Sequence, residues 1–172
     1  MSHIKIGIIA WLLILPAFVV AQRDAEKRPS PARLAEAKVQ GVSIRIDYGS
    51  PSVKNREIWG KLVPYGKIWR TGANEATTIL TDADILIEGE LLKAGRYALF
   101  TIPDKDVWTI VINTNADQWG AYKYNQDLDV LRIKVRPQIV DEMQETLLFK
   151  FEGSMLTMRW ERLVLPLKFS KP

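Results

Sequence analysis

The period of the apolar residues is the feature that most limits the fold of this chain. Residues 42–48 alternate strictly: Val42, Ile44, Ile46 and Tyr48 are separated by polar side chains, the pattern of a strand buried on one face. Similar short runs recur at 77–80, 84–87, 96–102, 107–112, 130–135, 145–151, 155–160 and 163–169. No stretch after residue 40 keeps a helical period for a dozen residues. We therefore predict a single all-β domain, an antiparallel sandwich or a jelly-roll-like fold.

The segments that connect these runs give the remaining predictions about the fold. The four-residue break at 103–106 predicts a hairpin, and further turns are expected at 152–153 and near Arg162. Residues 34–39 are compatible with a helix or with an edge strand. Residues 55–66 predict a packed loop with a helical turn, and residues 113–127 predict a second long loop with exposed aromatic side chains.

The first 21 residues have the pattern of a secretory signal peptide. Lys5 precedes an apolar run over 6–20, and small or apolar residues lead to a cleavage site between Ala21 and Gln22. An uncleaved anchor is disfavoured because the run contains Pro16 and is shorter than the roughly 20 residues that span a bilayer. We expect an exported protein, periplasmic or extracellular, with no membrane span in its mature form. A polar linker over 22–32 would precede the domain at 33–172.

Charge and residue content exclude several classes of function. Without Lys5 the chain has 23 basic and 20 acidic residues, a surplus too small and too scattered to indicate nucleic-acid binding. Cysteine is absent and the one histidine, His3, lies in the predicted signal peptide. The mature chain therefore cannot build the usual zinc sites, a Ser-His-Asp triad or a Cys-His dyad. Any catalysis would depend on carboxylates, Lys, Tyr, Ser or Thr.

We expect no metal ion and no cofactor. Three Asp-x-Asp pairs occur at predicted turns or strand starts, but none has the ligand spacing of a calcium loop, so solvated turn acids are the better interpretation. The pairs are Asp82 with Asp84, Asp104 with Asp106, and Asp127 with Asp129.

The candidate site is the segment 69–78, which places an aromatic ring, a cation, an amide and a carboxylate around Gly72. Gly72 and Asn74 tolerate positive φ, so the chain can turn there and direct Arg70, Asn74 and Glu75 into a common space. Binding groups are often found on such loops above a β scaffold. The alternative is that Arg70 and Glu75 pair across a structural turn and bind nothing.

The tryptophans divide into two groups. Trp108 and Trp160 lie in strand patterns and are predicted to be core, with their indole N–H groups bonded to the backbone. Trp59, Trp69 and Trp119 lie in or beside loops, where a ring can stack on a sugar or can pack in the core instead.

The predicted binding set combines the loop aromatics with nearby polar groups, for a glycan or a small anionic ligand. It consists of Arg56, Trp69, Arg70, Asn74, Glu75, Thr77 and Trp119. Arg56 could pair with Glu75 or with an anionic ligand. Two alternatives remain open: a hydrolase in which Glu75 and a second acid are catalytic, and a structural interaction protein of the cell envelope.

Five groups of residues resemble, in the same order, a bacterial family known as domain of unknown function 2911. They are residues 69–78, residues 94–103, Trp108 with Asn113, Trp119 with Gly120, and Trp160 with Glu161. The resemblance extends from about Ser30 to the C-terminus. It implies a secreted or envelope-associated β domain, and it brings no established activity with it.

Overall fold

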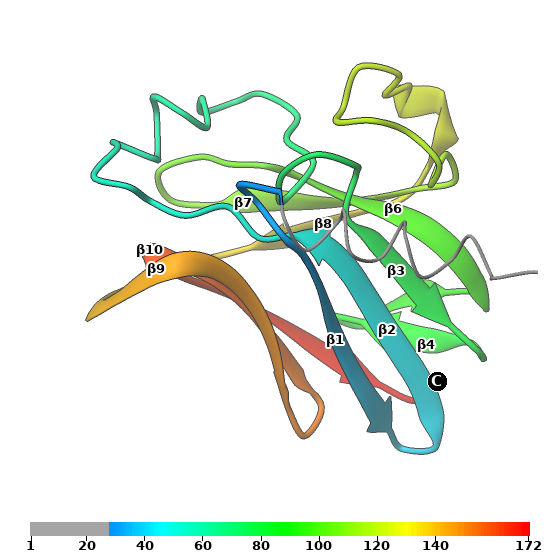
Figure 1. Cartoon of the computed structure of the whole chain (residues 1–172). Coiled ribbons are helices and arrows are strands. Elements are labelled where there is room, and N and C mark those ends of the chain that lie inside the picture. The colour runs from blue at the N-terminus through cyan, green and yellow to red at the C-terminus, as the bar shows by residue number, and fades with distance from the viewer. Residues whose placement is uncertain (1–27) are drawn as a thin grey trace, which may run out of the picture.

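Two antiparallel sheets, packed face to face, form the protein in a computed structural model that describes residues 28–172 (Figure 1). The larger sheet has the strand order β1-β2-β3-β6-β7-β8 and the smaller one has the order β5-β4-β10-β9. The predicted all-β sandwich is thus confirmed, whereas the predicted signal peptide lies outside the described residues. The strands are β1 (Ala32–Val39), β2 (Val42–Gly49), β3 (Thr78–Thr81), β4 (Ile85–Ile87), β5 (Glu90–Leu92), β6 (Gly95–Ile102), β7 (Trp108–Asn113), β8 (Asp129–Val135), β9 (Gln138–Glu152) and β10 (Met155–Ser170).

Residues 34–39, ambiguous in sequence, belong to an edge strand. β1 pairs with β2 along its whole length, from Ala32 opposite Gly49 to Val39 opposite Val42. The turn between the two strands has only two residues, Gln40 and Gly41, with φ of 49° and 94°. Positive φ at both central residues gives the turn twist that suits a two-residue hairpin, which explains the glycine.

The end of the chain forms one long strand instead of the two that the sequence predicts. The turn expected near Arg162 is wrong, because β10 runs unbroken from Met155 to Ser170. Register shifts on either side of Glu161, which has a φ of 58°, mark a β-bulge there. β10 pairs with β9 over its first part and with β4 at Phe169 and Ser170, so it joins the two sides of the smaller sheet.

Four tryptophans join the two sheets at one end of the core. The Trp59 ring lies 4.9 Å from the ring of Trp108 in β7 and 5.7 Å from that of Trp160 in β10, measured between centroids. Trp69 stacks on Trp160 at 5.9 Å with an interplanar angle of 18°. Since β7 and β10 belong to different sheets, the loop between β2 and β3 folds inward and inserts its two rings between them.

The hydrogen bonding of the indole nitrogens in this cluster differs from the prediction. Trp108 and Trp160 are buried core residues, but their Nε1 atoms, like that of Trp59, have no hydrogen-bond partner among residues 28–172. The prediction that they bond to the backbone is therefore wrong. Carbonyl groups in a sheet are already used by the strand ladder, and these rings are surrounded by other rings at steep angles.

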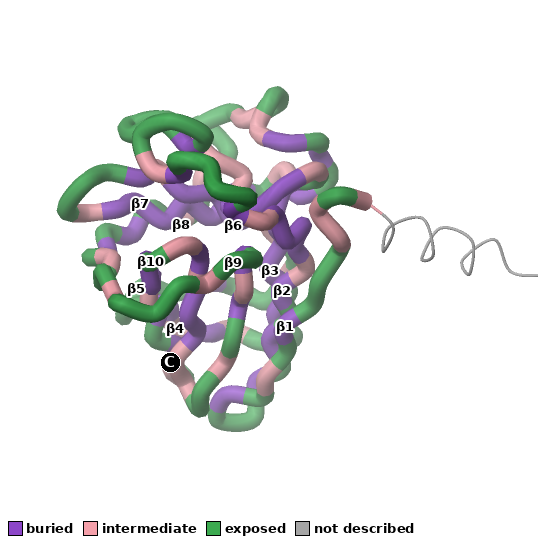
Figure 2. Tube along the Cα trace, turned by 60° about the vertical axis from the view of Figure 1, so that its left-hand side comes forward, coloured by how far each residue is buried: buried purple, intermediate pink, exposed green. Residues whose placement is uncertain are grey.

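The two longest loops, residues 50–77 and 114–128, lie at the same end of the sandwich (Figure 1). The second loop covers part of the outer face of the larger sheet, where Ala121 and Tyr124 pack on Phe100 and Val111. The Tyr124 hydroxyl donates to Oδ2 of Asp129 at 2.7 Å, which fastens the loop to the start of β8. Buried residues are concentrated in β6 and β7 at the centre of the larger sheet, whereas β1 and β9 are largely exposed (Figure 2).

No helix within residues 28–172 has both the length and the apolar character required to cross a membrane.

Candidate functional site

The segment 70–76 is held from both sides by backbone hydrogen bonds. On one side the Ala73 N–H donates to the Gly49 carbonyl at the end of β2, at 3.2 Å. On the other side Ala76 donates to Gln118 at 3.0 Å and Gly120 donates to Asn74 at 2.9 Å. Glu75 and Trp119 thus face each other across an antiparallel bridge. The two long loops form one fixed unit above the larger sheet.

Gly72 is explained by a close contact between two backbones and not by a left-handed backbone conformation. Positive φ occurs at Thr71 (54°) and Asn74 (64°), so the expectation is confirmed for Asn74 and wrong for Gly72. A Cβ at Gly72 would lie 2.9 Å from the Gly49 carbonyl oxygen. A Cβ at Gly49 would lie only 2.1 Å from the Ala73 carbonyl oxygen. Both positions therefore need a hydrogen atom in place of a side chain.

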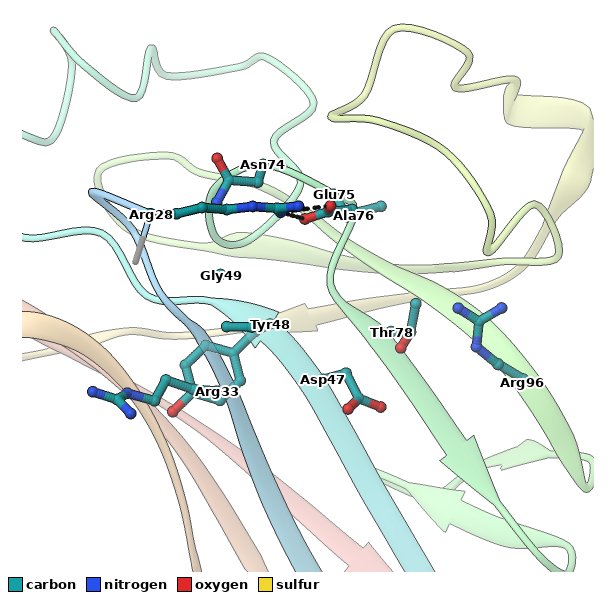
Figure 3. Close-up of a pocket in the computed structure, with 11 residues that line it drawn as sticks. Arg28, Arg33, Asp47, Tyr48, Gly49, Asn74, Glu75, Ala76, Thr78 and Arg96 are labelled. Carbon is teal, nitrogen blue, oxygen red and sulfur yellow. Dashed lines mark hydrogen bonds and ion pairs between the residues drawn. The ribbon is translucent and has the colours of Figure 1, made fainter. Parts of the chain in front are cut away.

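Two adjoining hollows open beside this unit, on the outer face of the larger sheet. The first has a volume of about 210 Å³ and is lined by residues 28 and 32–33, the end of β2, residues 74–76, Thr78 and Arg96. The second, of about 300 Å³, is lined by residues 75–76, Arg96 and residues 116–119. They share Glu75, Ala76 and Arg96. Figure 3 shows Asp47, Thr78 and Arg96 on neighbouring strands below Glu75.

Opposite charges are paired around the hollows. Nη1 of Arg28 donates to both carboxylate oxygens of Glu75, at 2.7 and 3.0 Å (Figure 3). Arg96 donates to Asp117 at 2.6 Å. Arg45 donates to Asp47 through two nitrogens at 2.9 and 2.7 Å, and these contacts raise the pKa of Arg45 further. Each pair is solvent-exposed, so it contributes little to stability and its members remain available to a ligand.

Aromatic groups complete the walls. The Trp119 side chain is 54% exposed, and the guanidinium carbon of Arg28 lies 6.0 Å from its ring centroid. Tyr48 is buried below the first hollow, where burial raises the pKa of its hydroxyl. That hydroxyl accepts a hydrogen bond from the Phe149 N–H at 3.3 Å. Trp119 is thus the aromatic surface that a ligand can reach.

Three residues of the predicted set line the hollows: Asn74, Glu75 and Trp119. The Asn74 side chain also donates to the Ser30 carbonyl at 2.9 Å. Glu75 is exposed and pairs with Arg28, a residue 47 positions away, in place of Arg70. The alternative in which Arg70 and Glu75 pair across a turn is therefore wrong.

The other four predicted residues lie elsewhere. Thr77 is fully buried, and its hydroxyl donates to the Thr71 carbonyl at 2.9 Å. Trp69 packs in the tryptophan cluster. Arg56 donates to the carbonyls of Ser52 and Val53 and so supports its own loop. Arg70 extends toward Gly120, and its buried Nε has no partner among residues 28–172.

Several lining residues were absent from the predicted binding set, namely Arg28, Asp47, Thr78 and Arg96. Asp47 lies at an outward position of a strand whose alternation is visible in the sequence, so its exposure could have been predicted. Arg96 lies near the start of β6, which shows no such alternation. Their proximity depends on the order β2-β3-β6 in the sheet. That order brings together strands separated by a hairpin, β4-β5, which belongs to the other sheet.

The two carboxylates of the first hollow are each paired with an arginine. Glu75 and Asp47 both line it, and each accepts two hydrogen bonds from an arginine. A glycosidase uses one carboxyl group as the acid and a second as nucleophile or base, and here both carboxylates are engaged by arginines. The aspartates at the turns bind neighbouring amides and cations: Asp82 accepts from the Ser43 N–H, and Asp84 from Lys93. Residues 28–172 contain no group of three or more acidic, His or Cys side chains that could hold a metal ion.

Comparison with known proteins supports a family and nothing finer. A family model described as "Protein of unknown function (DUF2911)" matches residues 30–169, which is most of the chain. No curated protein and no solved structure matches the sequence.

Proposed function

Because this chain belongs to the DUF2911 family, whose description states no activity, we propose its function from the geometry of the site: it is a binding module for a small polar ligand of the glycan class. The ligand lies in the two adjoining hollows beside the segment 70–76. The observation that carries the proposal is the position of Trp119, half-exposed at the edge of a hollow that also contains Glu75 and Arg96.

The chemistry of a sugar fits this combination. A pyranose ring has an apolar face of C–H groups, which packs on an indole, and hydroxyl groups at its edge, which bond to carboxylates, guanidinium groups and amides. Glu75, Arg96 and Asn74 supply one group of each kind. Volumes of about 210 and 300 Å³ suit one or two sugar rings rather than a long oligosaccharide.

The test is a titration of the exported chain with hexose and N-acetylhexosamine mono- and disaccharides, followed by calorimetry. Stacking on Trp119 buries most of an aromatic face, so Trp119→Ala is expected to weaken binding about tenfold or more. Trp119→Phe should restore part of the affinity because it keeps an aromatic face.

Tyr122→Ala is the matched control. Tyr122 belongs to the same loop and is 84% exposed, but it does not line either hollow, so its removal should leave the affinity unchanged. If no saccharide binds, or if Trp119→Ala binds as tightly as the natural chain, the proposal is refuted. Co-purification with a protein partner would then favour the structural interaction role.

We also infer that the protein acts outside the cytosol, on the pattern of residues 1–21. N-terminal sequencing of the mature protein should begin at Gln22. A mature chain that retains Met1 in the cytosolic fraction would contradict this inference.

A further inference from the structure

The segment 28–31 is fixed on the protein surface before β1 begins. The Ser50 N–H donates to the Pro31 carbonyl at 2.9 Å, and the Asn74 amide donates to the Ser30 carbonyl at 2.9 Å. Prolines at 29 and 31 restrict φ along the segment. Arg28 therefore stands only two residues from an anchored carbonyl, and its side chain extends over the end of β2 to Glu75 (Figure 3).

The Arg28 head group makes two kinds of contact there. A single nitrogen, Nη1, donates to both oxygens of Glu75, and the guanidinium carbon lies 6.0 Å from the Trp119 ring centroid. A carboxylate beside an aromatic face is a general arrangement for holding an organic cation. Because only one nitrogen donates to the carboxylate, the contact does not require the two-pronged fork of arginine. An alkyl ammonium group could make it equally well.

The surroundings of this contact favour exchange. The Arg28 side chain is 38% exposed and the Glu75 side chain 56%, so both partners reach solvent. An exposed ion pair of this kind contributes no more than about a factor of five to an equilibrium constant. The neighbouring carboxylate of Asp117, at the edge of the second hollow, is exposed as well, but it is paired with Arg96 and leaves Glu75 as the acid that a cation would contact.

We propose that Glu75 and Trp119 form a subsite for the alkyl ammonium or guanidinium group of a small ligand, and that Arg28 is the internal occupant which this ligand displaces. The subsite lies in the hollow to which the proposed function assigns the ligand. It therefore rests on that proposed function, and it adds a cationic group to the ligand. Segment 28–31 then acts as a built-in competitor that raises the ligand concentration needed for binding.

The experiment uses the mature chain labelled with ¹⁵N and follows the indole N–H signal of Trp119, assigned with Trp119→Phe. n-Butylammonium and methylguanidinium are the probes, and n-butanol is the uncharged control. Arg28→Ala should bind either cation about tenfold more tightly than the natural chain, because neither the ion pair nor the ring contact of Arg28 has to be displaced. Glu75→Gln in the Arg28→Ala background should abolish the saturable shift.

Arg136→Ala provides the matched control, since Arg136 is exposed and does not line the hollows. It should bind the probes like the natural chain, and all variants should keep the natural unfolding temperature because the altered residues are on the surface. Equal affinity of Arg28→Ala and the natural chain for n-butylammonium, or binding that survives Glu75→Gln, would overturn the proposal.

The two proposals fail separately. Cation binding without saccharide binding would refute only the glycan class of ligand, and saccharide binding without cation binding would refute only the subsite.

Discussion

The contact between Gly49 and Ala73 gives the strongest prediction of this structure. A methyl group added at Gly49 would place its carbon 2.1 Å from the Ala73 carbonyl oxygen and 2.8 Å from the carbonyl carbon. Both are backbone atoms that cannot rotate away. To reach an ordinary contact, the end of β2 and the segment 70–76 must separate by more than 1 Å. The Ala73 N–H bond to the Gly49 carbonyl, already 3.2 Å long, would then break.

Two contributions to the free energy of unfolding add up in the Gly49→Ala variant. Forcing a methyl group into a close-packed contact typically costs about 1–3 kcal/mol, and losing a partly buried backbone hydrogen bond costs about 1 kcal/mol. We therefore expect the free energy of unfolding to fall by about 2–4 kcal/mol. For a domain of this size such a loss lowers the melting temperature by about 10 °C. Urea unfolding followed by tryptophan fluorescence measures the change directly.

Gly41→Ala separates the clash from the general effect of replacing glycine. A Cβ at Gly41 meets nothing within 4 Å, but the residue has a φ of 94°, so the expected cost is about 1 kcal/mol from backbone strain alone. Gly49→Ala should be clearly the more damaging. If it unfolds within about 0.5 kcal/mol of the natural chain, the close approach of the two backbones does not exist and the account of the site is refuted.

Two other perturbations test the frame around the site. Tyr124→Phe removes the hydroxyl that donates to Asp129. The free energy of unfolding should therefore fall by about 1 kcal/mol, and proteolysis within residues 114–128 should accelerate. An unchanged rate of cleavage would show that this hydrogen bond does not hold the loop. Hydrogen bonds from the side chain and the backbone N–H of Ser43 lower the pKa of Asp82. Its stabilisation is therefore present above the unfolded value near 3.9 and is lost as pH falls through the lower folded value. The urea midpoint should drop between pH 5 and pH 3, and should drop less in Asp82→Asn.

Strand positions were largely predictable because each strand carries its own signal. Val42, Ile44 and Ile46 alternate with polar residues, and the buried face of β2 follows that alternation. The bulge at Glu161 was not predictable in this way. Locally, a polar residue such as Glu161, which has a positive φ in the structure, suggests a turn. Only the pairing of β10 with β9 on both sides of Glu161 shows that the strand continues.

The lining of the hollows could be predicted only in part, and the division has a physical reason. Asn74 and Glu75 line the first hollow, in keeping with the tendency of a turn-forming segment after a loop to present polar groups. Trp69 and Thr77 flank the same turn, but whether each faces inward depends on tertiary contacts. Trp160, 91 residues away, stacks on the first, and the Thr71 carbonyl accepts a bond from the second. Arg28 was missed because it reaches Glu75 from a segment that reads as a linker.

The placement of β10 has a consequence for the order of synthesis. This strand lies between β4 and β9 and contributes Trp160 and Phe169 to the core, yet it follows every other strand in the sequence. Until β10 has been synthesised, the smaller sheet lacks its central strand and cannot cover the inner apolar face of the larger sheet. The domain can therefore acquire its native packing only after β10 has been synthesised, in a late and cooperative event.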